Sequence, residues 1–328
     1  MAESTLAIAY TELRQEIGYE IGAGRTAGSW SSTQSSNIDQ IVKRGLRLFY
    51  KHPPIPGASN HQWRFLRPVT TIAVWPAFAA SASRLVDTSA DTVTADTGTT
   101  FYASMLTKAI HLGSTDYTIT AVGATTLTVT PDPNAEGDNI QWSMTSDGSY
   151  QLPDGFGGLI GKPVFSGEET QHGPLPIIGE HQIYERQQRS TDAGRPTAVA
   201  LRPRLQSTIT ASVGQRWELL VDPIPDAVYT LKYRYQILPD NISSGVAFAL
   251  GGAAHASTIL EACLAAAELM LNGGYGPHYG EFLTQLASSI EYDRTLYATD
   301  DFGYNGDASD GRVRDSDIHY VTVNGVQY

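Results

Sequence analysis

The chain has 328 residues, of which 41% are hydrophobic and 17% charged, so we expect one elaborated domain or two that fold along most of their length. Its 34 acidic and 22 basic side chains give a net charge of −12, which argues against a protein whose main task is to grip phosphate backbones. The one cysteine, Cys263, excludes an intramolecular disulfide and a cysteine-based zinc site within one chain, which suits assembly in a reducing cytoplasm. The first residues lack a basic stretch followed by an apolar run, and no window approaches the roughly 18 apolar residues of a membrane span, so neither a signal peptide nor a membrane segment is expected.

An amphipathic helix is predicted near the N-terminus, over residues 4–17. Its apolar stripe has spacings of four, three and four and consists of Leu6, Tyr10, Leu13 and Ile17. Glycines are expected to end or loosen it at Gly18, Gly22 and Gly24. The last two glycines, with Gly28, superficially resemble a dinucleotide-binding fingerprint, but a helix instead of a strand precedes them and the third glycine comes one place late. We therefore interpret this segment as a flexible connection between helices.

A second helix is predicted to start at Ser36 as N-cap, with Asp39 three residues on, and to stop at Pro53 and Pro54. Its apolar side consists of Ile38, Ile41, Val42, Gly45 and Phe49. The other side carries a basic edge, a candidate partner-binding site formed by Lys43, Arg47 and Lys51 at spacings of four. Two interpretations are open for this edge: it contacts phosphate, or it is a solvated helix face that meets an acidic neighbouring subunit. We favour the acidic neighbour, because three positive charges against a net charge of −12 give weak affinity for nucleic acid.

The periodicity shifts from helical towards two between about Pro68 and Pro239, which predicts β-structure. The clearest hairpin joins residues 117–122 to 125–130, with one buried and one wet face. Residues 71–145 carry two basic and seven acidic side chains, for a net charge of −5. We interpret them as an inserted β-module.

The main β-region is expected to start at Tyr150 and to include strands at 197–201, 217–221 and 229–235. One side of the last strand consists of Tyr229, Leu231, Tyr233 and Tyr235. Because a Pro-rich turn at 222–226 separates the last two strands, the pattern predicts a half-buried antiparallel hairpin between them.

Two further helices are predicted after this region. The first covers residues 255–271, with apolar positions at Ile259, Leu260, Cys263, Leu264, Ala267 and Leu271. The second follows residues 273–277, with a stripe of Tyr279, Phe282, Leu283, Leu286 and Ile290. Four helices from the two chain ends are expected to pack into one bundle from which an antiparallel β-sandwich or barrel region projects, an α+β fold. The expected parts are helices at 1–67, the smaller β-module at 68–149, the main β-region at 150–245, helices at 246–299 and a tail at 300–328.

The C-terminal tail consists of an acidic linker, residues 301–317, and a β-prone end, residues 318–328. The spacing of the linker aspartates does not fit a calcium-binding loop. Asn324 and Gly325 are expected to form a tight turn. Because an isolated hairpin is marginal in water, we hypothesise that the end binds the portal or an adjacent subunit by strand addition. The candidate partner-binding residues are Ile318, Tyr320, Val321 and Val323.

Motifs that carry chemistry are not found in the sequence. The eight histidines are scattered, with no two at helical metal-ligand spacing, so surface or loop positions are expected for them. Gly161 and Lys162 are followed by proline, and Phe156 stands where a phosphate-binding loop needs its first glycine. No recognisable nucleophile motif occurs, and Cys263 is expected to be a small buried hydrophobe. We therefore predict a non-enzyme without metal or cofactor.

Several segments carry a resemblance to a known family, in this order: a short N-terminal helix, then 46–53 (LRLFYKHP), 150–156 (YQLPDGF), 194–202 (GRPTAVALR), 219–233 and 282–294. Together, across residues 5–298, they resemble the head-to-tail connector or adaptor proteins of tailed bacteriophages, including the tail-tubular type of short-tailed phages. The module at 71–145 is similar to β-insertions of various virion proteins. It departs from the smallest, mostly helical adaptors and leaves the position in the particle open.

The resemblance implies a ring of about twelve copies at the head–tail interface of a virion, assembled in the host cytoplasm. Its implied partners are other copies of the chain, the portal protein, a tail tube or nozzle protein, and double-stranded DNA that passes without sequence-specific binding; no membrane is implied. The charge agrees with this, because an acidic wall repels DNA.

The alternative is a receptor- or carbohydrate-binding β-protein of the virion tail. The tyrosines, the five tryptophans and the threonine-rich strands support it. Against it, binding aromatics tend to cluster on exposed loops, whereas Tyr229, Tyr233 and Tyr235 share one side of a predicted strand, as core residues do.

Overall fold

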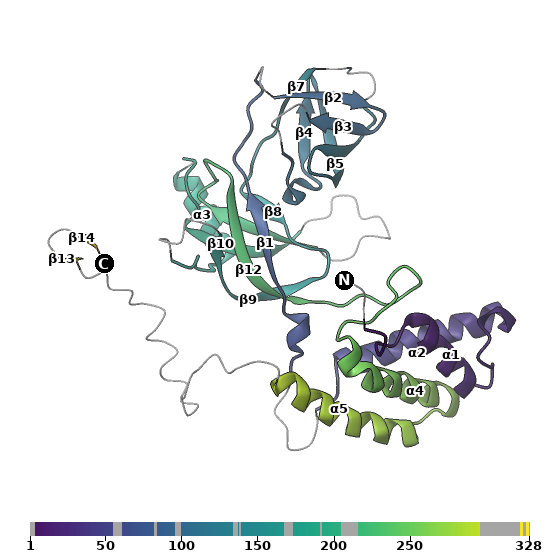
Figure 1. The fold of residues 1–328 in the computed structure, drawn as a ribbon. Coiled ribbons are helices and arrows are strands. Elements are labelled where there is room, and N and C mark those ends of the chain that lie inside the picture. The colour runs from purple at the N-terminus through teal and green to yellow at the C-terminus, as the bar shows by residue number, and fades with distance from the viewer. Residues whose placement is uncertain are drawn as a thin grey trace.

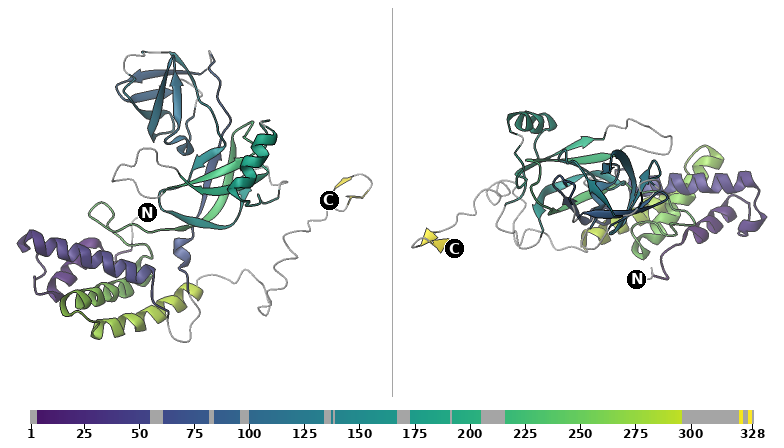
Figure 2. Two further views of the ribbon diagram at one scale, coloured as in Figure 1. Left: turned by 180° about the vertical axis from the view of Figure 1, so that it is seen from behind. Right: turned by 90° about the horizontal axis from the view of Figure 1, so that it is seen from above.

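The computed structural model describes residues 4–54, 61–81, 84–95, 100–133, 137, 139–166, 173–190, 192–204, 216–295, 322–323 and 326–327. Within these ranges the fold mixes five α-helices with antiparallel sheets, one of which closes into a six-stranded barrel. The barrel and four of the helices lie at opposite ends of the molecule, with two three-stranded sheets between them (Figures 1 and 2).

Helix α1 (Tyr10–Glu20) begins later than predicted and continues through Gly18. Leu13 and Ile17 are buried as expected, but Leu6 is 79% exposed and lies outside the helix. Gly18 lies within the helix, and its missing side chain lets the Trp30 ring approach; a Cβ there would lie 2.5 Å from the ring. Gly22 and Gly24 follow the helix with left-handed φ angles, so the helix ends where these two glycines predicted.

Helix α2 (Ser32–Tyr50) starts earlier than predicted, and Ser36 lies inside it. The N-cap is Ser31, whose hydroxyl accepts a hydrogen bond from the Gln34 amide at 3.2 Å, while the Gln34 side chain accepts one from the Ser31 amide at 2.9 Å. This reciprocal pair satisfies two backbone donors and fixes the start. All five positions of the predicted apolar side are buried, which confirms that side.

Helices α4 (Ala256–Asn272) and α5 (Pro277–Thr295) share one hydrophobic core with α1 and α2. Gly45 of α2 packs against Cys263 of α4, which is fully buried as predicted. Leu271, predicted on the same side of α4, is 56% exposed in the last turn. The buried Glu268 side chain accepts hydrogen bonds from the Gly276 and His278 amides, and so caps the start of α5.

One described helical segment, Ala253–Asn272, is long and apolar enough to cross a membrane by length and composition. More than half of it, 56%, is buried inside the fold. Its packing on α2 and α5 accounts for its apolar character.

Two three-stranded sheets form the middle of the molecule. The first has the order β1 (Val69–Val74), β12 (Tyr229–Ile237) and β9 (Phe156–Phe165). The second has the order β10 (Ala198–Pro203), β11 (Trp217–Asp222) and β8 (Ser149–Gln151). Side chains from both sheets and from the barrel join one hydrophobic cluster, which includes Tyr150, Leu219 and Tyr233.

The predicted hairpin between residues 217–221 and 229–235 is wrong. These segments are β11 and β12, which pair with different neighbours and belong to different sheets. The alternation in β12 is confirmed, since Leu231 and Tyr233 are buried while Lys232 and Arg234 are exposed. Alternation shows that one face is buried but does not identify the strand beside it.

Helix α3 (Glu180–Arg189) interrupts the region that was predicted to contain β-structure alone. It packs on β10 and β11 through Ile183, its one buried residue, which contacts Ala200 and Leu220. Its two apolar residues, Ile183 and Tyr184, are adjacent in sequence and give no helical stripe, which explains why periodicity did not reveal this helix.

The barrel is formed by β2 (Leu85–Ser89), β3 (Thr92–Ala95), β4 (Ala109–Leu112), β5 (Thr115–Val122), β6 (Thr126–Thr130) and β7 (Ile140–Ser143). The predicted hairpin within 117–130 is confirmed as β5 and β6, with Ile119, Leu127 and Val129 buried. Closure leaves the barrel without the open edges of a flat sheet.

Candidate interaction surfaces

The predicted basic edge of α2 is exposed. The side chains of Lys43, Arg47 and Lys51 all face solvent, on the side of the helix opposite its buried stripe. Within the described residues none of the three forms an ion pair with an acidic group of its own chain, so each charge is available to a partner. The helical period therefore predicted the exposure of this edge correctly.

A cavity of about 350 Å³ lies beside this edge, and sequence reasoning did not reveal it. Lys43, Arg47 and Tyr50 line one side of it, and Pro239, Asp240 and Asn241, which follow β12, line the other. The basic edge therefore borders the junction between the helices and the β-region. Two cations beside one carboxylate leave an excess of positive charge, which fits an acidic partner group.

The predicted C-terminal site falls largely outside the described residues. Ile318, Tyr320 and Val321 lie outside them, as does the acidic linker 301–317. Val323 lies in β13 (Thr322–Val323), which pairs antiparallel with β14 (Val326–Gln327), Val323 opposite Val326. This pairing leaves two residues between the strands, as the expected turn at Asn324 and Gly325 requires. Partner binding by this segment stays a prediction.

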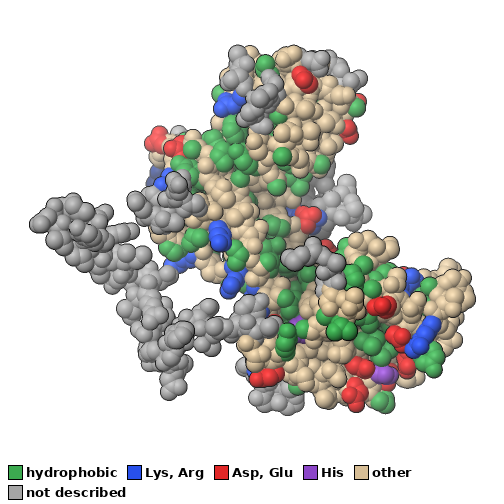
Figure 3. Space-filling model, viewed as in Figure 1, with side chains coloured by type: hydrophobic (Ala, Val, Ile, Leu, Met, Phe, Trp, Pro, Cys, Tyr) green, Lys and Arg blue, Asp and Glu red, His purple; other side chains and the backbone are tan. Residues whose placement is uncertain are grey.

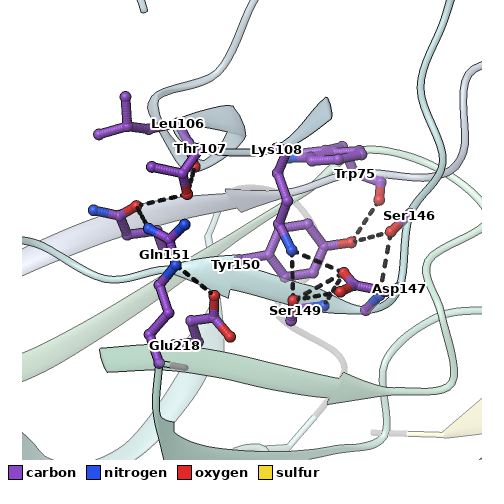
Figure 4. Close-up of polar contacts among 12 residues, drawn as sticks. Trp75, Leu106, Thr107, Lys108, Ser146, Asp147, Ser149, Tyr150, Gln151 and Glu218 are labelled. Carbon is purple, nitrogen blue, oxygen red and sulfur yellow. Dashed lines mark hydrogen bonds and ion pairs between the residues drawn. The ribbon is translucent and has the colours of Figure 1, made fainter. Parts of the chain in front are cut away.

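A polar network joins the barrel to the second sheet (Figure 4). The Lys108 ammonium, next to β4, lies 2.9 Å from the Asp147 carboxylate and also donates to the Ser149 hydroxyl. The Tyr150 hydroxyl donates to the Trp75 carbonyl and contacts the Ser146 hydroxyl at 3.0 Å. Tyr150 is fully buried, so these bonds hold β8 against the chain that leads from β1 into the barrel.

The electrostatics of this network favour a structural role. Burial alone would raise the pKa of the Asp147 carboxyl, but the Lys108 ammonium and hydrogen bonds from Lys108 and Ser149 lower that pKa below its usual value. Burial raises the pKa of the Tyr150 hydroxyl, so Tyr150 remains a neutral donor. The Glu218 carboxylate, 6% exposed, pairs with Arg202 at 2.9 Å and Arg204 at 3.3 Å. The Asp147 and Glu218 carboxylates are thus both matched by cations.

A second buried cluster lies where α2, the chain after it, and α5 meet. The His61 imidazole lies 2.8 Å from the Asp293 carboxylate, which is 1% exposed and also accepts a hydrogen bond from the Arg64 amide. His255 is 2% exposed, which corrects the expectation of a surface or loop position. The rings around it, from Phe49, Trp63, Phe65 and Tyr292, exclude water.

Burial lowers the pKa of both His61 and His255; the nearby Asp293 carboxylate opposes that shift without reversing it. The His255 Nδ1 atom is buried without a hydrogen-bond partner in the described part of the chain. In the same ranges no group of three or more histidine, cysteine, aspartate or glutamate side chains is arranged to hold a metal ion. The cluster therefore ties the helices together as neutral packed rings.

A cavity of about 490 Å³ opens between β1, the chain before β4 and the chain after β8. Its walls are mostly apolar and include Ile72, Phe101, Leu106 and Leu152. The hydroxyl of Tyr233, which also lines the cavity, is buried without a partner among the described residues. A ligand with an apolar body and one hydrogen-bonding group fits this lining.

No model of a known protein family matches the sequence, and no curated protein matches it either.

Proposed function

We propose that the chain is a structural protein of a tailed-bacteriophage particle, which assembles into a ring between the portal and the tail and catalyses no reaction. The observation that carries this proposal is the arrangement of the chain: helices from both ends share one core, and the β-region between them projects from it (Figure 1). The same order of parts carries the resemblance to head-to-tail connectors.

In this proposal α1, α2, α4 and α5 form one bundle that packs against neighbouring subunits. Close contacts support a rigid unit: Gly45 of α2 touches Cys263 of α4, and the Thr258 and Ser289 hydroxyls join α4 to α5. Lys43, Arg47 and Lys51 meet an acidic surface of the next copy. Such a contact joins two different faces of the chain, and repeating it around an axis closes a ring.

The β-region forms the wall through which DNA passes. The net charge of −12 repels phosphate, so the genome slides without sticking. The closed barrel and the polar network around Tyr150 support a wall that keeps its shape. The C-terminal segment with Val323 binds the portal or an adjacent copy by strand addition, and a tail tube or nozzle protein binds the opposite end.

Electron microscopy and mass measurement of the purified chain test the ring. Rings of one size are expected, and a chain that remains monomeric at every concentration would refute the proposal. Arg47→Glu is expected to weaken ring assembly, because it reverses a charge on the basic edge. The matched control is Arg189→Glu on the exposed side of α3, which should assemble as the natural chain does.

One observation favours the alternative of a carbohydrate- or receptor-binding protein. The 490 Å³ cavity has aromatic walls and the unpartnered Tyr233 hydroxyl. However, Tyr229 and Tyr235 pack against the core beside Tyr233, which removes the exposed aromatic cluster that sugar binding would use. Binding on a glycan array that Tyr233→Phe abolishes would favour this alternative. Absence of glycan binding would favour the connector function.

A further inference from the structure

The outer face of the sheet β1–β12–β9 is basic on an acidic protein. Lys232 and Arg234 of the central strand are exposed, and neither forms an ion pair within the described residues. The three strands contain no aspartate or glutamate at all. Figure 3 shows Lys and Arg side chains over these strands. This face is therefore a separate positive surface, distinct from the basic edge of α2.

Apolar side chains flank the two charges. Opposite Lys232 stand Thr71 and Val164, and opposite Arg234 stand Val69 and Ile160. Val69 is 50% exposed and Val164 is 36% exposed. Because side chains opposite one another on neighbouring strands share a face, the charges and the valines form one surface. A segment that combines carboxylates with aromatic side chains would satisfy it.

The chain itself carries such a segment beyond α5. Residues 300–317, here called the acidic leash, contain six aspartates and two arginines, for a net charge of −4. Phe302 and Tyr304 supply two aromatic rings within it. We propose that the acidic leash of each chain docks on the β1–β12–β9 face of the same chain, its aspartates on Lys232 and Arg234 and its aromatic rings on the valines.

The attachment point of the leash favours this occupant. Helix α5 ends at Thr295, two residues after Asp293, whose carboxylate accepts a hydrogen bond from the Arg64 amide at 3.1 Å. Arg64 begins the short turn that leads into β1 at Val69. Helix α5 thus ends near the start of the basic face, so the tethered segment beyond it has a high effective concentration there.

The length of the leash is also sufficient. Eighteen extended residues span about 60 Å, whereas the nine residues of β12 span about 30 Å. A docked leash covers a sheet face whose charge would otherwise attract phosphate. The acidic wall of the protein is thereby completed by its own C-terminal segment.

A fluorescent label on the leash tests the docking in the full chain. Ser309→Cys supplies the attachment site, and the natural Cys263 is fully buried and so does not compete for the dye. At 0.1 M salt the docked leash should hold the dye at high anisotropy. At 1 M salt the anisotropy should fall to that of a free peptide, because the screening length shrinks from about 10 Å to about 3 Å.

Charge reversal locates the docking surface. Lys232→Glu with Arg234→Glu should give the free-peptide anisotropy at both salt concentrations. Arg44→Glu with Arg189→Glu, a matched change of exposed residues on α2 and α3, should behave as the natural sequence. Circular dichroism checks that both variants fold, and the salt titration of the natural sequence needs no substitution. The proposal would be overturned by a mobile dye in the natural sequence at 0.1 M salt, or by equal release of the dye in both double variants. It would also be overturned if the sheet face bound a DNA duplex while the dye stayed mobile.

Discussion

At residue 45 a glycine brings two helices into direct contact. A Cβ at Gly45 would lie 2.5 Å from both the Cα and the Sγ atoms of Cys263, closer than such atoms approach in proteins. Because Cys263 is fully buried at this contact, the space cannot be recovered by moving its side chain into solvent. Burial also raises the pKa of its thiol, so Cys263 acts as a packing residue.

Gly45→Ala should therefore destabilise the fold by about 1–3 kcal/mol, the usual cost of overpacking a core. The matched control is Gly280→Ala in α5, where nothing lies within reach of an added Cβ. It should stabilise by about 0.5–1 kcal/mol through helix propensity. Urea unfolding measures both changes, and a neutral or stabilising Gly45→Ala would contradict the close contact of α2 with α4.

The buried histidines make stability depend on pH. Burial lowers the pKa of His61 and His255 below the ordinary 6.5, so the unfolded chain binds more protons as the pH falls through 6.5. The contribution of the two histidines to the free energy of unfolding is fully present above that pH. It is lost on acidification towards the folded pKa values, by up to about 1.4 kcal/mol per pH unit for each histidine.

His255→Phe should flatten this dependence, because the new ring fills the same aromatic site without a titrating group. His181→Gln on α3 is the control, since His181 is 86% exposed. Urea unfolding at pH 7.5 and pH 5.5 measures the slope for each variant. A natural chain whose stability is unchanged between these pH values would show that the histidines are not held neutral.

At the scale of the helix and strand, the start of α2 shows how a cap outweighs a pattern. Ser36 and Asp39 gave a plausible start, but Ser31 and Gln34 satisfy two backbone donors five residues earlier. Ser31→Ala should cost about 1 kcal/mol of stability. Ser36→Ala, an exposed position within the helix, should change it by less than about 0.5 kcal/mol, or stabilise it. Equal losses of stability from the two substitutions would instead support a helix start at Ser36.

Sequence periodicity predicted which face of a helix or strand is buried better than it predicted which strands pair. The buried stripe of α2, the basic edge with Lys43, and the alternation of β12 follow from the helical and strand repeats, and the structure confirms their burial and exposure. The repeats do not encode which strands pair, so the separation of β11 from β12 could not be predicted. The cavity at Asp240 escaped prediction because its two sides are about 190 residues apart in the chain.

The Tyr150 hydroxyl makes one of the bonds that hold β8 beside the barrel, together with those of Lys108. Tyr150→Phe keeps the ring but leaves the buried Trp75 carbonyl without its donor, which should cost about 1–3 kcal/mol. Hydrogen exchange should rise at the contact between β8 and the barrel before it rises inside β5 and β6. Tyr275→Phe, at a residue that is 49% exposed, should change stability little. Unchanged exchange in Tyr150→Phe would show that the network does not hold the barrel in place.

The charge of the whole molecule is divided among separate surfaces. Residues 71–145 have a net charge of −5, while the strands β1, β12 and β9 contain no acidic residue and α2 carries its own basic edge. A chain with oppositely charged faces associates with copies of itself in a fixed orientation. The net charge of −12 at the same time disfavours binding to nucleic acid, which agrees with the proposed wall of a DNA passage.

The central claim, a ring that joins portal to tail, is tested most directly by electron microscopy of the full chain mixed with the portal of the same virus. We expect rings of one size that dock coaxially on the portal, with the C-terminal segment at the contact. Monomers that ignore the portal, or rings that stack only on one another, would contradict it.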